Sequence, residues 1–140
     1  MVQKTAPPGV PVYIGAFEDA LFGPVAAFGM AGMATELLGD LAYRIPPLTD
    51  VDVAEMVREV RAAPLLFGHR GGEHADVAAL EDIVHRLTRL VYDLPEVVSA
   101  ELMPVLVGRS GAAVLGAAIS LGDAGSVSRS DWYARRLTGP

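Results

Sequence analysis

Residues 10–30 read VPVYIGAFEDALFGPVAAFGM, and this stretch predicts a β-hairpin. Its opening places a branched apolar residue at every second position: Val10, Val12 and Ile14. That two-residue period is typical of a strand with one buried face. Residues 18–24 read as the connecting turn and residues 25–30 as the returning strand. Because Pro11 has no N–H to donate, we expect the first strand to lie at a sheet edge or to start late.

Two amphipathic helices are predicted downstream. The first begins at Thr49 and ends at Pro64, and the second begins at Asp76 and ends at Pro95. The apolar positions of the first recur at helical spacing: Val53, Met56, Val57 and Val60. Those of the second form a longer stripe: Val77, Leu80, Ile83, Val84, Leu87, Leu90 and Val91. Each helix therefore has one face that must pack against another element.

Two further strands are predicted, over residues 97–107 with a kink at Pro104 and over residues 112–121. The order of two strands, two helices and two strands favours an α+β fold, an antiparallel sheet with two main helices packed on one face. Residues 1–121 then form the domain. Residues 122–140 are rich in Gly, Ser, Asp and Arg, which indicates a tail or an interdomain linker.

Composition narrows the functional classes. The 140 residues carry a net charge of −6 and Lys4 is the only lysine, so neither a nucleic-acid partner nor an anionic membrane surface is favoured. No apolar stretch approaches the roughly 20 residues of a transmembrane helix, and no signal-peptide pattern opens the chain. Cysteine is absent, which excludes disulfides and thiol catalysis and fits a reducing compartment. We expect a soluble, cytoplasmic protein without a membrane partner.

Four segments together resemble one known family. They are residues 2–15, 22–25, 29–36 and 101–106. In order and spacing they are similar to the C-terminal half of the ATP-grasp domain of NDP-forming acyl-CoA synthetases, relatives of the succinyl-CoA synthetase β subunit. The resemblance implies that residues 1–121 are an ATP-grasp C-terminal subdomain and that the bound cofactor is ATP or ADP.

The resemblance also implies nucleotide-binding residues. Gln3 and Lys4 fall in the run that matches the hinge whose backbone receives the adenine, with a plain strand end as an equal alternative. Glu36 matches the acidic end of a Gly-Gly-x-x-x-Glu segment, where glycine allows a ligand to approach the backbone closely. Its alternative is a purely structural role. Glu101 matches the acidic position of an acidic-apolar-Asn-Pro signature and is a weak candidate metal ligand, with a solvated strand residue as its alternative.

Three positions depart from the family's pattern. Pro11 stands where the family places a Glu for the ribose hydroxyls, and a pyrrolidine ring offers neither donor nor acceptor. Met103 and Gly116 stand where an Asn and an Asp would hold Mg²⁺. Because Mg²⁺ takes oxygen ligands, a thioether and a bare Cα cannot replace them. We therefore expect no Mg²⁺ site and no catalytic residue in this chain alone.

The histidines do not have the spacing of a metal site. His69 and His74 flank a glycine-rich loop, and His85 falls on the polar side of the second helix. Metal sites built from nitrogen ligands usually need three or four protein donors, and no third donor has suitable spacing here. We expect a surface loop at the first pair and a solvated side chain at His85.

Two functions stay open. The first is part of an acyl-CoA synthetase, whose family reaction turns a carboxylic acid, CoA and ATP into acyl-CoA, ADP and phosphate. Its partner would be the missing N-terminal ATP-grasp half or the CoA-binding domain of the same protein, and the isolated chain would be inactive. The second is a degenerate, non-catalytic module that senses nucleotide or binds another domain, in a protein fused to an acetyltransferase domain. A face that a missing half would cover also favours a homodimer.

Overall fold

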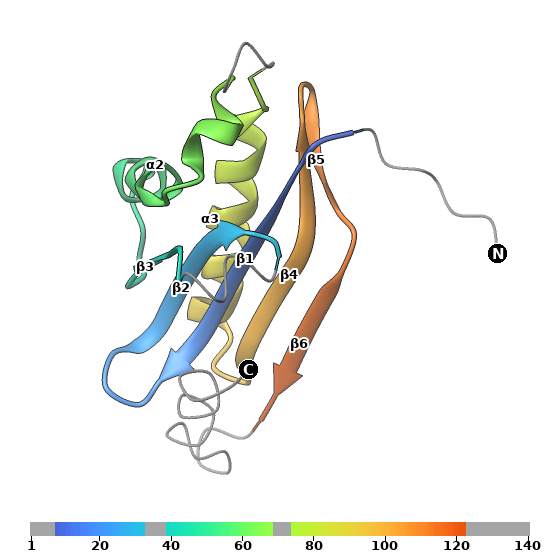
Figure 1. The fold of residues 1–140 in the computed structure, drawn as a ribbon. Coiled ribbons are helices and arrows are strands. Elements are labelled where there is room, and N and C mark those ends of the chain that lie inside the picture. The colour runs from blue at the N-terminus through green and yellow to red at the C-terminus, as the bar shows by residue number, and fades with distance from the viewer. Residues whose placement is uncertain (1–7, 33–38, 69–73, 123–140) are drawn as a thin grey trace, which may run out of the picture.

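A computed structural model describes residues 8–32, 39–68 and 74–122, which form an antiparallel sheet with helices on one face (Figure 1). The described strands are ordered β3-β2-β1-β4-β5, and β6 pairs with β4 beside β5. Every one of these strand pairs is antiparallel. The predicted α+β class and the packing of two main helices on one face are confirmed.

The predicted hairpin is formed by β1 (Val10–Asp19) and β2 (Gly23–Met30). Its turn is fixed by a buried carboxylate, since Asp19 Oδ1 accepts the backbone N–H groups of Leu21 at 2.8 Å and Phe22 at 3.1 Å. Gly23 then adopts a φ of 74°, a conformation that L side chains disfavour. The turn chemistry therefore holds the two strands in register.

The expectation that β1 lies at a sheet edge is wrong, because β1 pairs with β2 on one side and with β4 (Val97–Gly108) on the other. The alternative, a late start, holds only for the pairing with β2, which begins at Val12, since β1 itself begins at Val10. Pro11 is tolerated because it lies near the start of the strand. Its carbonyl oxygen accepts the N–H of Ala31 at 3.0 Å, just beyond the last residue of β2. In an antiparallel ladder the N and O atoms of one residue face the same neighbour. The missing N–H therefore points past the end of β2, and no bond to β4 is lost.

Both predicted helices are present. Helix α2 (Asp50–Glu59) starts in a capping box between Thr49 and Asp52, and α3 (Val77–Asp93) is capped by Asp76. Helix α2 ends before the predicted Pro64, which instead belongs to the short 3-10 helix η1 (Ala63–Leu66). Strand β3 (Leu41–Arg44), which pairs with β2, was not predicted from the sequence.

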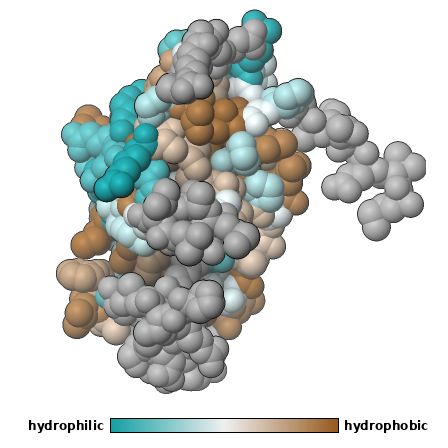
Figure 2. Space-filling model, in the orientation of Figure 1, coloured by the Kyte–Doolittle hydropathy of each residue, from teal (hydrophilic) through white to brown (hydrophobic). Residues whose placement is uncertain are grey.

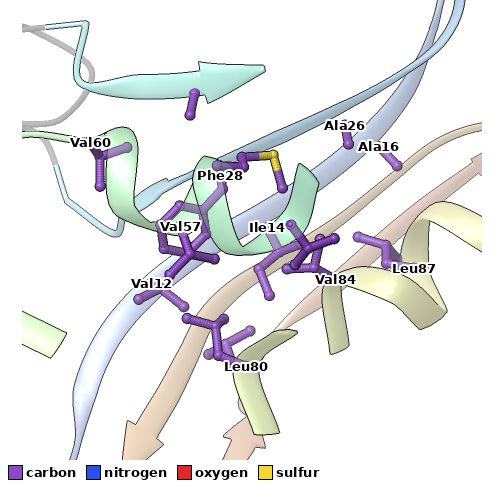
Figure 3. Close-up of a cluster of buried hydrophobic side chains, with 14 of the residues drawn as sticks. Val12, Ile14, Ala16, Ala26, Phe28, Val57, Val60, Leu80, Val84 and Leu87 are labelled. Atoms are coloured by element: carbon purple, nitrogen blue, oxygen red, sulfur yellow. The ribbon is translucent and has the colours of Figure 1, made fainter. Parts of the chain in front are cut away.

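The main core lies between the sheet and the helices (Figure 3). Alternate residues of β1 and β2 face the apolar stripes of α2 and α3, as the two periodicities require. The fully buried members include Val12, Ile14, Phe28, Val57, Leu80 and Val84. Full burial of such a side chain stabilises the fold by about 1.5–3 kcal/mol relative to exposure.

The predicted strand over residues 112–121 is two strands, β5 (Gly111–Val114) and β6 (Ala117–Leu121). The break lies opposite Met103 and Pro104 of β4. At the same place the pairing of β4 with β1 loses register between Val12 and Ile14. The kink predicted at Pro104 therefore corresponds to an irregularity that separates β5 from β6 and shifts the register between β4 and β1.

Hydrophilic and hydrophobic residues gather in different parts of the surface (Figure 2). Hydrophilic residues gather over α2, while hydrophobic residues lie along the margin formed by β5 and β6. Neither described helix has the length and apolar character needed to cross a membrane.

Candidate functional site

The candidate site is the sheet face turned away from the helices. Because strand side chains alternate, Tyr13, Gly15 and Phe17 of β1 share this face. Phe17 lies opposite Val25, and Gly15 lies opposite Ala27, both on β2. Four apolar residues of this face form a second, smaller buried cluster that is separate from the main core: Tyr13, Phe17, Val25 and Ala27. The face thus combines small residues with two aromatic rings.

A tyrosine crosses this face to reach β4. Gly15 is the register partner of Glu101, and the Tyr13 side chain lies over the bare Cα of Gly15. A Cβ at position 15 would overlap the Tyr13 hydroxyl oxygen and its ring. That hydroxyl donates a hydrogen bond to Oε1 of Glu101 at 3.0 Å. Glu101 is therefore half-buried and hydrogen-bonded, rather than a freely solvated strand residue.

Met103 and Gly116 lie side by side. The Met103 N–H donates to the Gly116 carbonyl at 3.0 Å, and the Leu115 N–H donates to the Pro104 carbonyl at 2.9 Å. Met103 is 49% exposed. A Cβ built on Gly116 would overlap the carbonyl oxygen of Met103. The two positions are thus as close as joint metal ligands would have to be, and neither side chain offers an oxygen.

Pro11 belongs to the same face. It is exposed and lies opposite Leu106 of β4, on the alternate positions of β1 that also carry Tyr13. Its ring can neither donate nor accept a hydrogen bond, so it supplies no polar contact to a bound ligand.

The described residues of this face do not fit a magnesium site. Mg²⁺ demands near-octahedral oxygen coordination, commonly from one or two carboxylates with waters and phosphates. Here Glu101 is the carboxylate nearest to Met103 along β4, and one of its oxygens already accepts from Tyr13. Within residues 8–32, 39–68 and 74–122, no group of three or more His, Cys, Asp or Glu side chains is arranged to hold a metal ion.

Several residues singled out in the sequence fall elsewhere. Gln3, Lys4, Glu36 and His69 lie outside the described residues. His85 is not simply solvated, because its Nε2 lies 3.2 Å from Oδ1 of Asp50 and joins α3 to the start of α2. His74 makes an edge-on contact with Phe67, with ring centroids 6.4 Å apart. Both histidines lie on elements or loops away from the Tyr13–Glu101 face.

Sequence reasoning missed the role of Tyr13. The signal was present as a tyrosine two residues before a glycine in an alternating strand, which puts both on one face. Its partner on β4 could not be foreseen, because Tyr13 and Glu101 are 88 positions apart.

Comparison with known proteins gives this arrangement a context. The family model of the ATP-grasp domain matches residues 1–121. Acetate–CoA ligase (ADP-forming) I of Archaeoglobus fulgidus is 42% identical over 123 residues, which is 88% of this chain and 18% of the relative. The β subunit of acetate–CoA ligase (ADP-forming) II of Pyrococcus furiosus is 41% identical over 112 residues, 79% of this chain and 48% of the relative. The chain thus spans about half of that subunit and less than a fifth of the longer ligase.

Solved structures agree with the sequence comparison. An acetyl-coenzyme A synthetase of Candidatus Korarchaeum cryptofilum, in complex with coenzyme A and Mg-AMPPCP, superposes with a TM-score of 0.80 at 38% identity. The match covers 84% of this chain and 55% of that one. The apo form of that synthetase superposes with a TM-score of 0.81 over 86% of this chain and 57% of its own.

Proposed function

The chain belongs to the ATP-grasp family, and from this premise we propose that it forms one wall of the nucleotide cleft of an NDP-forming acyl-CoA synthetase. The reaction of the whole enzyme would convert a carboxylic acid, CoA and ATP into acyl-CoA, ADP and phosphate. The similarity to several ADP-forming acyl-CoA ligases supports this proposal. In it, residues 1–121 are the working domain and residues 122–140 a tail or linker.

The other wall of the nucleotide cleft would come from a partner. Relatives such as the Pyrococcus β subunit are about twice as long as the matched part of this chain. We propose that the partner is an N-terminal ATP-grasp half or a CoA-binding domain of the same protein. A cytoplasmic location, favoured by the lack of cysteine, is part of the proposal.

By itself the chain would be inactive. The observation that carries this statement is the contact between Met103 and Gly116, where two adjacent positions supply no oxygen ligand. Phosphoryl transfer depends mostly on positioning and on neutralising charge, usually by lysine and Mg²⁺. Lys4 is the only lysine of the chain. The groups that would lower the barrier are therefore largely missing from these residues.

A turnover assay tests this. The purified 140-residue chain is incubated with ATP, CoA, acetate and Mg²⁺, and ADP and acetyl-CoA are measured. We expect no formation of either product above the rate without protein. Magnesium-dependent turnover that co-purifies with the chain would overturn the proposal of inactivity.

A second candidate is a non-catalytic module that senses nucleotide, in a protein that also carries an acetyltransferase domain. The Tyr13–Glu101 hydrogen bond favours this non-catalytic module, because the bond engages the carboxylate that a metal ion would need. Pro11, which supplies no ribose contact, points the same way.

Calorimetric titration with ADP, in Mg²⁺ and in EDTA, separates the two candidates. A module that senses nucleotide binds ADP with the same affinity in both buffers. A catalytic part that needs its partner shows no ADP binding alone and gains it when the missing half is added. Tighter binding of ADP by the isolated chain in Mg²⁺ than in EDTA would contradict both candidates.

A further inference from the structure

The outer edge formed by β5 and β6 has the chemistry of a strand that pairs with another strand. In the described part of the chain, both strands pair only with β4, so together they form one margin of the sheet. Every residue of β6 is exposed, with Ile119 at 54% and Leu121 at 71%. Contacts from α3 reach β4 and β5, and β6 extends beyond the main contacts of that helix.

This margin consists of short strands, but it lacks charge and proline, two of the features that usually protect an edge. Residues 111–121 read GAAVLGAAISL and contain no charged residue and no proline. Native sheets normally guard exposed edges with charges, proline or very short strands. The opposite margin carries such a charge, since β3 ends in Arg44, which is ion-paired to Glu59.

The backbone of β6 is oriented for pairing. The Gly116 carbonyl and the Gly122 N–H both bond to the β4 side, to Met103 and Glu96. Because N–H and C=O groups alternate in direction along a strand, the even-numbered residues between them face β4. The hydrogen-bonding groups of Ala117, Ile119 and Leu121 therefore face outward.

We propose that β6 pairs antiparallel with β6 of a second copy of this chain, about a two-fold axis at Ile119. Ile119 then lies opposite its own counterpart, and Ala117 lies opposite Leu121 of the second copy. On the other face of the sheet, Ala118 lies opposite Ser120. Small or apolar residues meet at each of these positions, and the two sheets join into one.

The distribution of charge favours this surface, over the rest of the molecule, as the contact between two copies. Each copy carries a net charge of −6, so two copies repel each other in general. An uncharged strip is where they can approach without placing like charges opposite one another, which destabilises a strand pair. An isologous contact of this kind closes on itself and yields a dimer, not a filament.

Sedimentation of the full chain over a range of concentrations tests the dimer. We expect a reversible monomer–dimer equilibrium for the native chain. Ile119→Lys places two like charges across the axis and should weaken the dimer at least about tenfold, a change of 1.4 kcal/mol. Leu21→Lys is the matched control, because Leu21 is 86% exposed on the distant β1–β2 turn and should leave the equilibrium unchanged. A native chain that stays monomeric, or equal effects of the two lysines, would overturn the proposal.

Cysteine cross-linking tests the register, since the chain has no cysteine of its own. In Ile119→Cys the two paired Cα atoms would be about 5.5 Å apart, within the roughly 4.4–6.8 Å that a disulfide spans. In Ser120→Cys the two cysteines would be diagonal neighbours across the pair of β6 strands, about 7–8 Å apart. We expect rapid oxidation to a covalent dimer at position 119, slower oxidation at 120 and none in Leu21→Cys. Circular dichroism confirms that each variant is folded, and failure of the folded Ile119→Cys chain to cross-link faster than Ser120→Cys overturns this register.

Discussion

Tyr13 and Gly15 show how one missing side chain organises the candidate site. The tyrosine can lie across β1 because Gly15 has no Cβ, and only then does its hydroxyl reach Glu101. A carboxylate that accepts a hydrogen bond in a partly buried place is more costly to leave unpaired than one in water. The two residues therefore act as a unit, and their substitutions should not be additive.

Gly15→Ala should destabilise the fold by about 1–3 kcal/mol, because the new methyl group displaces the Tyr13 ring in a packed cluster. Chemical denaturation monitored by circular dichroism measures the free energy of unfolding. The control is the double variant with Tyr13→Val, in which the ring is gone and the methyl group has room. We expect a coupling of at least about 0.5 kcal/mol between the two sites. Strict additivity would show that Tyr13 does not lie over Gly15.

Gly116→Asp alone should also be destabilising, by about 1–3 kcal/mol, because its Cβ meets the Met103 carbonyl oxygen and the backbone must shift. Met103→Asn is the matched control, since Met103 is half-exposed and its replacement should change the unfolding free energy by less than about 0.5 kcal/mol.

The double variant Met103→Asn, Gly116→Asp, which supplies both oxygen ligands, tests whether this residue pair matters for nucleotide binding. In the presence of ADP, its thermal midpoint should rise when Mg²⁺ is added, because a ligand that binds the folded state stabilises it. The midpoint of the native chain should not change. A double variant that is equally indifferent to Mg²⁺ would mean that positions 103 and 116 do not correspond to the family's metal ligands.

At the scale of single residues, the sequence revealed departures from the family's pattern but not the contacts between side chains. The family resemblance gave Pro11, Met103 and Gly116 as positions without ligands, and the structure places the last two in direct contact. It could not predict the Tyr13–Glu101 bond, which depends on the register between β1 and β4. Nor could it show that Gly116 is sterically enclosed, because that depends on the backbone path at Pro104.

Among the elements, local signals were reliable and long-range ones were not. The hairpin turn, the caps of both helices and their apolar stripes involve neighbours within a few residues, and all are present. The position of β1 in the middle of the sheet depends on β4, which is far away in sequence. The short β3 has no alternation of its own to reveal it, and it exists because β2 offers it a partner.

The start of α2 should make stability depend on pH. The N–H of Thr49 donates to the Asp52 carboxylate at 2.8 Å, and this bond, with the Thr49 hydroxyl next in importance, lowers the pKa of Asp52 from its ordinary value of 3.8. A carboxyl group whose pKa is lower in the folded state stabilises the fold above its unfolded pKa, and this contribution is lost as pH falls through the folded value. We expect Asp52→Asn, which keeps an acceptor oxygen but no charge, to show a shallower loss of stability below about pH 4.

Urea denaturation at pH 7 and at pH 3 measures how much unfolding free energy the native chain and Asp52→Asn each lose at low pH. Thr49→Ser is the control, since serine is an equally good cap and should keep the native pH dependence. Parallel curves for the native chain and Asp52→Asn would show that the capping box does not titrate.

Considered as a whole, the molecule is a sheet with a single layer of helices, and α3 is the element that ties the layer to the sheet. It contacts β1, β2, β4 and β5, so strands from both ends of the chain pack against one helix. The smaller apolar cluster on the opposite face includes four buried residues, against a much larger set on the helix side. Cooperative unfolding should therefore depend on the helix-side core.

Leu80 is the residue that tests this cooperativity. It is fully buried on α3 among the β1 side chains (Figure 3), so Leu80→Ala should destabilise the fold by about 2–5 kcal/mol through lost contacts and a cavity. Leu65→Ala in η1 is the control, because that side chain is 49% exposed and should cost less than about 0.5 kcal/mol. If helix and sheet unfold as one unit, the helical circular dichroism signal and the near-ultraviolet tyrosine signal should shift to lower urea together. Loss of the helical signal while the tyrosine signal stays at its native midpoint would show that the sheet is stable without α3.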